Sequence, residues 1–304
     1  MRVATIDIGT NTVLLLVAER RSDGLLVPVE ERATITRLGE GVDKTRTLAP
    51  AAIDRTKACL DAYADIVRAQ RVEKIAVVGT SAMRDAGGGD IIRAHVKERL
   101  GVEARTISGD EEARLTFKGA LSGLPLGDAK RVQVFDIGGG STEVVQGDRA
   151  MGSIAFAKSY DVGSVRLTER HVKSDPPLAA ELAAVRDAAR AAFAPVPAFD
   201  ADAPPIGIAG TVTTLAAIAQ SMTTYDAARV HGSSLDVETL ERIVARLAAL
   251  PLAARRDVPG LEPKRADVII AGALVVLAFL AQTKATTMIV SDRGVRWGLA
   301  EELV

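Results

Sequence analysis

The chain has 304 residues, of which 48% are hydrophobic and 25% are charged, as is usual for soluble globular proteins. Its 38 basic and 39 acidic residues give a net charge of −1, so it has no overall positive field to attract nucleic acid or an anionic membrane surface. A polyanion would have to be bound by a local group of side chains. The length suits two ordinary domains.

The location of the protein is indicated by three features. The N-terminus reaches Asp7 before any long apolar run, and the longest apolar stretch, 268–281, suits a buried helix better than a membrane span. The one cysteine, Cys59, lies among apolar helix-like residues and has no partner for an internal disulfide. We therefore expect a cytoplasmic protein without nucleic-acid or membrane partners and with Cys59 in its core.

The predicted elements begin with a strand, a turn and a strand in "ATIDIGTNTVLLLV", which contains Asp7, Thr10 and Asn11. Apolar periodicity then predicts a mixed α/β pattern. In the first half we expect helices at 51–69, 89–99 and 111–121 and strands at 74–78 and 103–107. In the second half we expect strands at 131–135, 143–146, 153–160 and 205–209, helices at 178–193, 211–220, 237–250 and 264–283, and a surface loop at 194–205.

The second half opens with a repeat of the first. "VFDIGGGSTEVV", residues 134–145, again places Asp-Ile-Gly and hydroxyl residues between two apolar strands. Asp7 and Asp136 lie a domain's length apart. We predict an α/β protein with two duplicated lobes, residues 1–122 and 123–304, joined by the Gly- and Pro-containing link 122–130 and separated by a cleft.

The three consecutive glycines admit two explanations. Either the chain forms a hairpin whose turn requires positive φ, or the backbone N–H groups and hydroxyls of the turn bind a phosphate. Asp136 and Glu143, which flank the turn and suit a cation, favour the second explanation. The candidate phosphate ligands are Gly138, Gly139, Gly140, Ser141 and Thr142. The spacing is not a Rossmann fingerprint, and no Walker A ending occurs in the chain.

Six motifs, in order, resemble the exopolyphosphatase and guanosine pentaphosphate phosphohydrolase family: "DIGTNT", "GTSAMRDA", "SGDEEARLTF", "FDIGGGSTEVV", "IAGTVTTLAA" and "SDRGVRWG". The resemblance implies a duplicated actin-like/ribonuclease H-like ATPase fold in its short two-domain form. It also implies a hydrolase that removes terminal orthophosphate from inorganic polyphosphate, with pppGpp as an additional substrate. Homodimerisation is plausible for this family.

One of two adjacent glutamates is the candidate general base. A Ser108-x-x-Glu111 capping box accounts for Glu111 without any role in catalysis. Consecutive helical residues point about 100° apart, so only one of the two glutamates readily faces a site. The resemblance places the base on the glutamate immediately before the alanine, which is Glu112.

Other residues are assigned by chemistry and by the resemblance. Asp136 and Glu143 are candidate ligands of Mg²⁺ or another divalent cation, and Asp7 offers a matching carboxylate from the first lobe. The remaining candidates for substrate binding are Thr10, Asn11, Arg84, Gly210 and Thr211. Arg84 has an ion pair with Asp85 or Asp90 as its alternative role. Gly210 and Thr211 lie between a strand and a helix, where N–H groups bind anions. Three further arginines, Arg37, Arg293 and Arg296, have no assigned role.

Two other functional classes remain open. One is an ATP-dependent small-molecule kinase of the same fold group, which would not require the glutamate motif in this form. The other is a non-catalytic nucleotide-binding regulatory protein. The rates of orthophosphate release from polyphosphate, pppGpp and ATP distinguish these classes from an exopolyphosphatase.

Overall fold

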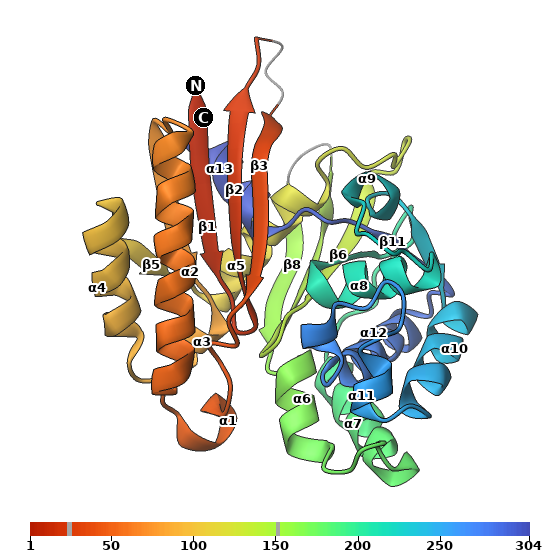
Figure 1. Ribbon diagram of the computed structural model, residues 1–304. Helices are drawn as coiled ribbons and strands as arrows, with labels where there is room; N and C mark the ends of the chain where they lie inside the picture. Colours follow the sequence, from red (N-terminus) through yellow and green to blue (C-terminus); the bar gives the residue numbers. More distant parts are fainter. Residues whose placement is uncertain (23–25, 150–152) are drawn as a thin grey trace. The chain divides into compact units, whose positions relative to one another are not determined.

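The computed structural model describes residues 1–22, 26–149 and 153–304 (Figure 1). The chain forms two compact units. Unit 1 comprises Met1–Gly119 together with Val295–Val304, and unit 2 comprises Ala120–Gly294. The first boundary is close to the expected division at 122 and 123, whereas the C-terminal segment, expected in the second lobe, belongs to unit 1.

Unit 1 contains one sheet and its covering helices. Its strands are β1 (Arg2–Ile8), β2 (Thr12–Arg20), β3 (Leu26–Ile35), β4 (Lys74–Gly79) and β5 (Ala104–Thr106). Its helices are α1 (Val42–Thr45), α2 (Pro50–Ala69), α3 (Ser81–Asp85), α4 (Gly89–Leu100), α5 (Gly109–Ala120) and α13 (Val295–Leu303). The strand order is β3-β2-β1-β4-β5, in which β1, β2 and β3 pair antiparallel and β4 and β5 continue parallel to β1.

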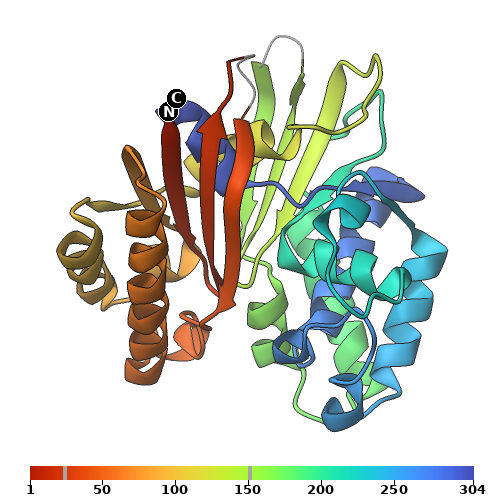
Figure 2. The same ribbon diagram turned by 45° about the horizontal axis from the view of Figure 1, so that its top comes forward.

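Successive side chains of β1 point to opposite faces of the sheet and pack in two different hydrophobic clusters. Ala4, Ile6 and Ile8 pack in the cluster that includes the buried residues of α2 and α4. Val3 packs instead with Trp297 and other residues of α13. Figure 2 shows α2 and α13 on opposite faces of this sheet. Because α13 buries its apolar residues on this face, it belongs to unit 1, and Asp7 lies on the same face by its spacing from Val3.

Unit 2 has a larger sheet. Its strands are β6 (Arg131–Ile137), β7 (Thr142–Asp148), β8 (Ser153–Tyr160), β9 (Ile206–Ile208), β10 (Ser234–Asp236) and β11 (Thr287–Val290). Its helices are α6 (Ser164–His171), α7 (Ala179–Phe193), α8 (Ala209–Ala219), α9 (Ala227–Val230), α10 (Val237–Ala248), α11 (Leu252–Arg255) and α12 (Ile269–Thr283), with a 3-10 turn, η1, at Pro263–Arg265. The strand order is β10-β11-β9-β6-β7-β8.

The two sheets share one plan, which confirms the predicted duplication. In unit 2, β6, β7 and β8 pair antiparallel and β9 continues parallel to β6, as β1, β2, β3 and β4 do in unit 1. The apolar stretch 268–281 forms α12, whose residues 269–280 are all buried. The rings of Phe135 and Phe279 lie 4.3 Å apart, centroid to centroid, in this core. No helix in the described residues is long and apolar enough to cross a membrane.

The other differences from the expected elements are one helix that begins late and several elements that were not expected. The expected helix 264–283 begins only at Ile269, because a 3-10 turn precedes it. Two long elements were not expected, β3 with ten residues and α13 with nine. The other unexpected elements have at most eight residues each, and they are α1, α3, α6, α9, α11, β10 and β11. Cys59 is buried as predicted, and burial raises the pKa of its thiol.

Candidate active site

The turn after β1 is held by a loop that follows β3. The carbonyl of Thr10 accepts from the Gly39 N–H over 2.8 Å, and that of Asn11 accepts from the Thr36 and Arg37 N–H groups over 3.1 and 3.0 Å. Asn11 is 6% exposed, and its Nδ2 is buried without an acceptor among the residues that the structure describes. A buried amide donor without a partner is costly, and an acceptor on a water or a ligand would satisfy it.

The glycine turn of unit 2 has the same length as the turn of unit 1. The register of β6 and β7 pairs Ile137 with Thr142, and that of β1 and β2 pairs Ile8 with Val13, so each turn has four residues. The Gly138 N–H donates to the Ser141 carbonyl over 3.0 Å. The two Asp-Ile-Gly stretches therefore align residue by residue.

Three N–H groups of the glycine turn are available to a ligand. The backbone N–H groups of Gly139, Gly140 and Ser141 have no acceptor within the described part of the chain. The described glycines with positive φ lie elsewhere, so the run 138–140 is not explained by a hairpin that needs positive φ. Consecutive backbone N–H donors in a turn are suited to binding an anion, so this turn remains the candidate phosphate site.

Two carboxylates flank the glycine turn on one face of the sheet. Asp136 and Glu143 are directly opposite each other in the β6–β7 pairing, where Cβ atoms typically lie about 4.5–5.5 Å apart. Glu143 is 1% exposed, and its Oε1 accepts from the Ser159 hydroxyl over 2.6 Å. Like charges opposite each other are unfavourable unless a cation compensates them. In the described residues no group of three or more His, Cys, Asp or Glu is close enough to hold a metal ion.

Thr142 differs from its expected role as a phosphate ligand. Its side chain is fully buried, and its hydroxyl donates to the Val162 carbonyl over 2.6 Å. The alternation along β7 explains the difference, because Thr142 and Glu143 point to opposite faces of the sheet.

The junction of β9 and α8 lies beside the glycine turn, because Asp136 pairs with Ile208 in the parallel register of β6 and β9. Ala209, at this junction, has a φ of 71°, which is strained for a residue with a side chain. The next residue, Gly210, packs so closely against the Arg265 guanidinium that a Cβ atom would collide with it. Thr211 is 3% exposed. The candidates Gly210 and Thr211 thus follow the carboxyl end of β9, next to the carboxyl end of β6, where Asp136 lies.

Glu112 and Arg84 are in contact within unit 1. Arg84 Nη1 lies 3.2 Å from Glu112 Oε2 and 3.1 Å from the Ile107 carbonyl oxygen. The Glu112 side chain is 8% exposed and that of Arg84 is 25% exposed. The expected alternative partner, Asp85, is also present, 3.6 Å from Arg84 Nε. Arg84 therefore has both a surface partner and a contact with the candidate base.

The two adjacent glutamates have separate environments. The Glu111 N–H donates to Ser108 Oγ over 3.1 Å, which is half of the expected capping box. The Glu111 carboxylate turns instead to Arg105, 2.9 Å away. Glu111 is thus accounted for by the start of α5 and a surface ion pair, whereas Glu112 is buried at the same helix end.

The three unassigned arginines have local contacts. Arg37 has a φ of 53° in the loop that supports Asn11. Arg293 donates to the Ser122 hydroxyl over 3.0 Å, and Arg296 pairs with Glu31 over 2.7 Å while 11% of its side chain is exposed. Arg296 therefore has a structural role in unit 1.

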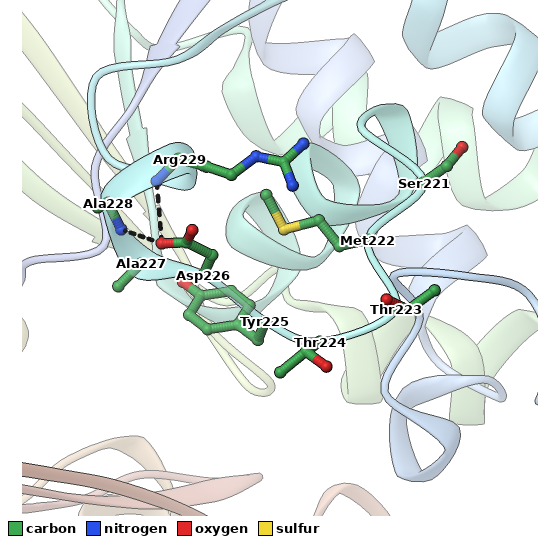
Figure 3. Close-up of a pocket in the computed structure, with 9 residues that line it drawn as sticks. All are labelled: Ser221, Met222, Thr223, Thr224, Tyr225, Asp226, Ala227, Ala228 and Arg229. Atoms are coloured by element: carbon green, nitrogen blue, oxygen red, sulfur yellow. Dashed lines mark hydrogen bonds between the residues drawn. The ribbon is translucent and has the colours of Figure 1, made fainter.

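A separate hollow of about 590 Å³ is lined by residues 221–229 (Figure 3). In it the Asp226 carboxylate accepts from the N–H groups of Ala228 and Arg229 and thereby caps α9. The lining includes none of the candidate site residues.

Comparison with known proteins identifies relatives along nearly the whole chain. The sequence model of the Ppx/GppA phosphatase family matches residues 16–304. Exopolyphosphatase 2 of Mycobacterium tuberculosis is 41% identical over 287 residues, which cover 90% of this chain and 88% of the relative. The guanosine-5'-triphosphate,3'-diphosphate pyrophosphatase of Vibrio atlanticus is 31% identical over 306 residues, which cover 99% of this chain and 59% of the relative.

Solved structures that resemble this chain over its whole length include a member of the same family. The crystal structure of an exopolyphosphatase-like protein is 32% identical, with a TM-score of 0.92 and coverage of 100% of this chain and 98% of that one. The Ppx/GppA family member of Aquifex aeolicus is also 32% identical, with a TM-score of 0.83 and coverage of 100% and 97%. These matches confirm the predicted fold.

Proposed function

The chain belongs to the Ppx/GppA phosphatase family, and on that premise we propose that it is an exopolyphosphatase, which removes terminal orthophosphate from inorganic polyphosphate. The observation that best supports this proposal is the glycine turn. Three consecutive N–H donors lie next to a pair of opposed carboxylates, and this combination suits a phosphate chain with its counter-cation.

Hydrolysis of a terminal phosphoryl group requires a base, and we assign this role to Glu112. Its carboxylate accepts a proton from water while the water oxygen bonds to the terminal phosphorus and the bridging P–O bond breaks. The leaving group is the shortened polyphosphate. Arg84 is in contact with Glu112. It fixes the orientation of the Glu112 carboxylate and places a positive charge beside it.

A divalent cation is part of the proposal. Asp136 and Glu143 would hold it, and two carboxylates fit Mg²⁺, which usually keeps several waters and shares substrate oxygens. Asp7, the corresponding aspartate of unit 1, is a further candidate cation ligand by its place in the sequence repeat. When bound, such an ion neutralises phosphate oxygen charge. The chain's own contribution is to hold the phosphate oxygens on the N–H groups of the glycine turn.

The second proposed substrate is pppGpp. The relative from Vibrio atlanticus is named for the pyrophosphatase reaction on this nucleotide and aligns with 99% of the chain. The 5'-triphosphate of pppGpp ends in the same phosphoanhydride linkage as polyphosphate. We also propose, from the composition and the single cysteine, that the enzyme acts in the cytoplasm, and, from the family resemblance alone, that it forms a homodimer.

A direct test compares orthophosphate release from medium-length polyphosphate, pppGpp and ATP in the presence of Mg²⁺. We expect release from polyphosphate to be fastest for the wild-type protein and lost in Glu112→Gln. If ATP and a sugar or carboxylic acid gave a phosphorylated product faster than polyphosphate gave orthophosphate, the kinase alternative would replace this proposal.

A further inference from the structure

The glycine turn rests on the first turn of α6. The Gly138 carbonyl accepts from the Ser164 N–H over 3.0 Å, and the Gly139 carbonyl accepts from the Val165 and Arg166 N–H groups over 2.9 and 3.1 Å. N–H groups in the first turn of a helix have no partner within the helix. The helix and the turn therefore complete each other's hydrogen bonding.

The side chain of Arg166 completes this support. Its Nε donates to the Gly140 carbonyl, and the side chain is 8% exposed. Its Nη2 lies 3.6 Å from the carboxylate of the exposed Asp161. A guanidinium is costly to bury unless it is hydrogen-bonded, so these contacts fix the position of Arg166.

Peptide geometry links these carbonyl contacts to the ligand side of the turn. A trans peptide is planar, and its C=O and N–H point in opposite directions. Since the carbonyls of residues 138, 139 and 140 face α6, the N–H groups of Gly139, Gly140 and Ser141 face away from it. A hydrogen bond to a carbonyl also polarises the N–H of the same peptide. The guanidinium on the Gly140 carbonyl thus acts on the Ser141 N–H.

We propose that Arg166 is a positioning residue, which orients and polarises the N–H groups of the glycine turn for the terminal phosphoryl group. This role rests on the proposed function, because it assumes that the turn binds polyphosphate. Arg166 itself does not contact the substrate. Its effect on binding passes through the peptide between Gly140 and Ser141.

Gly163 gives a second way to disturb the same support. A Cβ atom there would lie 2.5 Å from the Gly139 carbonyl oxygen and 2.7 Å from its carbon. The φ of Gly163 is −158°, which any residue adopts, so glycine is needed for close approach and not for backbone conformation. The methyl group of Gly163→Ala should push against the Gly139 carbonyl and so displace the turn, on the side of the turn that faces α6 and not the phosphate.

The test measures the affinity for polyphosphate in variants that also carry Glu112→Gln, because this substitution should prevent hydrolysis of the substrate during the measurement. Arg166→Met should raise the Kd about tenfold, the effect expected for loss of a charge-assisted hydrogen bond. Gly163→Ala should raise the Kd more than threefold, because its methyl group displaces the Gly139 carbonyl. Arg166→Lys keeps the charge and should restore part of the affinity. The matched control is Arg255→Met, because Arg255 is another buried arginine of unit 2, 3% exposed, that donates to three carbonyls outside the turn.

Thermal melts distinguish binding from stability. Arg166→Met and Arg255→Met should both melt at lower temperature, but at a temperature where all proteins are folded only Arg166→Met should lose affinity. The positioning role is overturned if Arg166→Met and Gly163→Ala bind within threefold of their parent, or if Arg255→Met loses as much affinity. If Arg166→Met does not fold, Gly163→Ala decides by the same threefold criterion. A parent that binds no polyphosphate would overturn the proposed function as well.

Discussion

Arg84 holds Glu112 from a different element of the chain: its Nη1 lies 3.2 Å from Glu112 Oε2 and also contacts the Ile107 carbonyl that precedes α5. The arginine follows β4 and the glutamate lies in the first turn of α5. The parallel pairing of β1, β4 and β5 brings these strand ends to one edge of the sheet of unit 1. Asp7, the penultimate residue of β1, lies at the same end of the sheet.

The role of Glu112 predicts a large effect of a small change. Glu112→Gln removes the proton acceptor but keeps the shape, so kcat should fall roughly 10²–10⁴-fold while polyphosphate still binds. Glu111→Gln is the matched control, because Glu111 pairs with Arg105 at the surface. Steady-state orthophosphate release measures both. Near-normal turnover of a folded Glu112→Gln protein would remove Glu112 from the mechanism.

Arg84→Met tests the contact with Glu112. Loss of a charge-assisted hydrogen bond to a nearly buried carboxylate should lower kcat/KM roughly 10–100-fold. Arg93→Met is the control, since Arg93 pairs with the exposed Asp90 in the same unit. If the two substitutions had equal effects on orthophosphate release, Arg84 would be only a surface ion-pair residue.

Metal removal tests the carboxylate pair. A chelator in excess should abolish activity without unfolding the protein, and Mg²⁺ should restore it, because Asp136 and Glu143 are proposed to share a cation. Asp136→Asn should raise the Mg²⁺ concentration that is needed to restore activity. Activity that survives exhaustive chelation at the wild-type rate would contradict a metal-dependent reaction.

Gly139→Val separates phosphate binding from turn strain. A β-branched side chain would obstruct an anion on the N–H groups, so we expect loss of activity and of polyphosphate-dependent thermal stabilisation. The melt should remain cooperative and within several degrees of wild type, because the glycine run has no positive φ to lose. Gly139→Ala is the milder control. Activity lost only in proportion to the unfolded fraction would indicate a role in the turn alone.

The pair of Arg186 and Glu241 joins α7 to α10 and predicts a dependence of stability on pH. Arg186 donates to both carboxylate oxygens, over 2.8 and 3.1 Å, and its hydrogen bonds lower the pKa of Glu241. Because the folded-state pKa is lowered, the stabilisation is present above the unfolded pKa of about 4.3 and is lost as pH falls through the folded value. Both side chains are partly exposed, so solvent limits the contribution to about 0.2–1 kcal/mol.

Melts of wild type and Arg186→Met at pH 7 and pH 3 check this dependence. The difference in melting temperature should be present at pH 7 and smaller at pH 3. An equal difference at both values would show that Arg186 stabilises the helices through packing and not through charge.

The repeated strands and their Asp-Ile-Gly turns could be predicted from the sequence, because they depend on local patterns. The start of α5 after Ser108 also follows from a local capping signal, whereas the pairing of the Glu111 carboxylate with Arg105 does not. By contrast, α13 contains a glycine and three charged residues and gives a weak periodic signal, so its packing on β1 depends on tertiary contacts.

The support of the glycine turn by Arg166 could not be predicted in the same way. The arginine lies 26 residues from Gly140 in a helix of eight residues, and no local pattern joins the two. The internal hydroxyl bond of Thr142 depended on the register of β7 with its neighbours, which the motif alone does not give.

The most direct test of terminal hydrolysis follows polyphosphate by 31P NMR, which resolves orthophosphate, chain-end phosphate and internal phosphate. Removal of a terminal group creates a new end each time, so we expect orthophosphate to accumulate while the concentration of chain ends stays constant until the chains become short. Glu112→Gln should leave the spectrum unchanged. An increase in chain ends before orthophosphate appears, or no orthophosphate at all with Mg²⁺ present, would contradict an exopolyphosphatase.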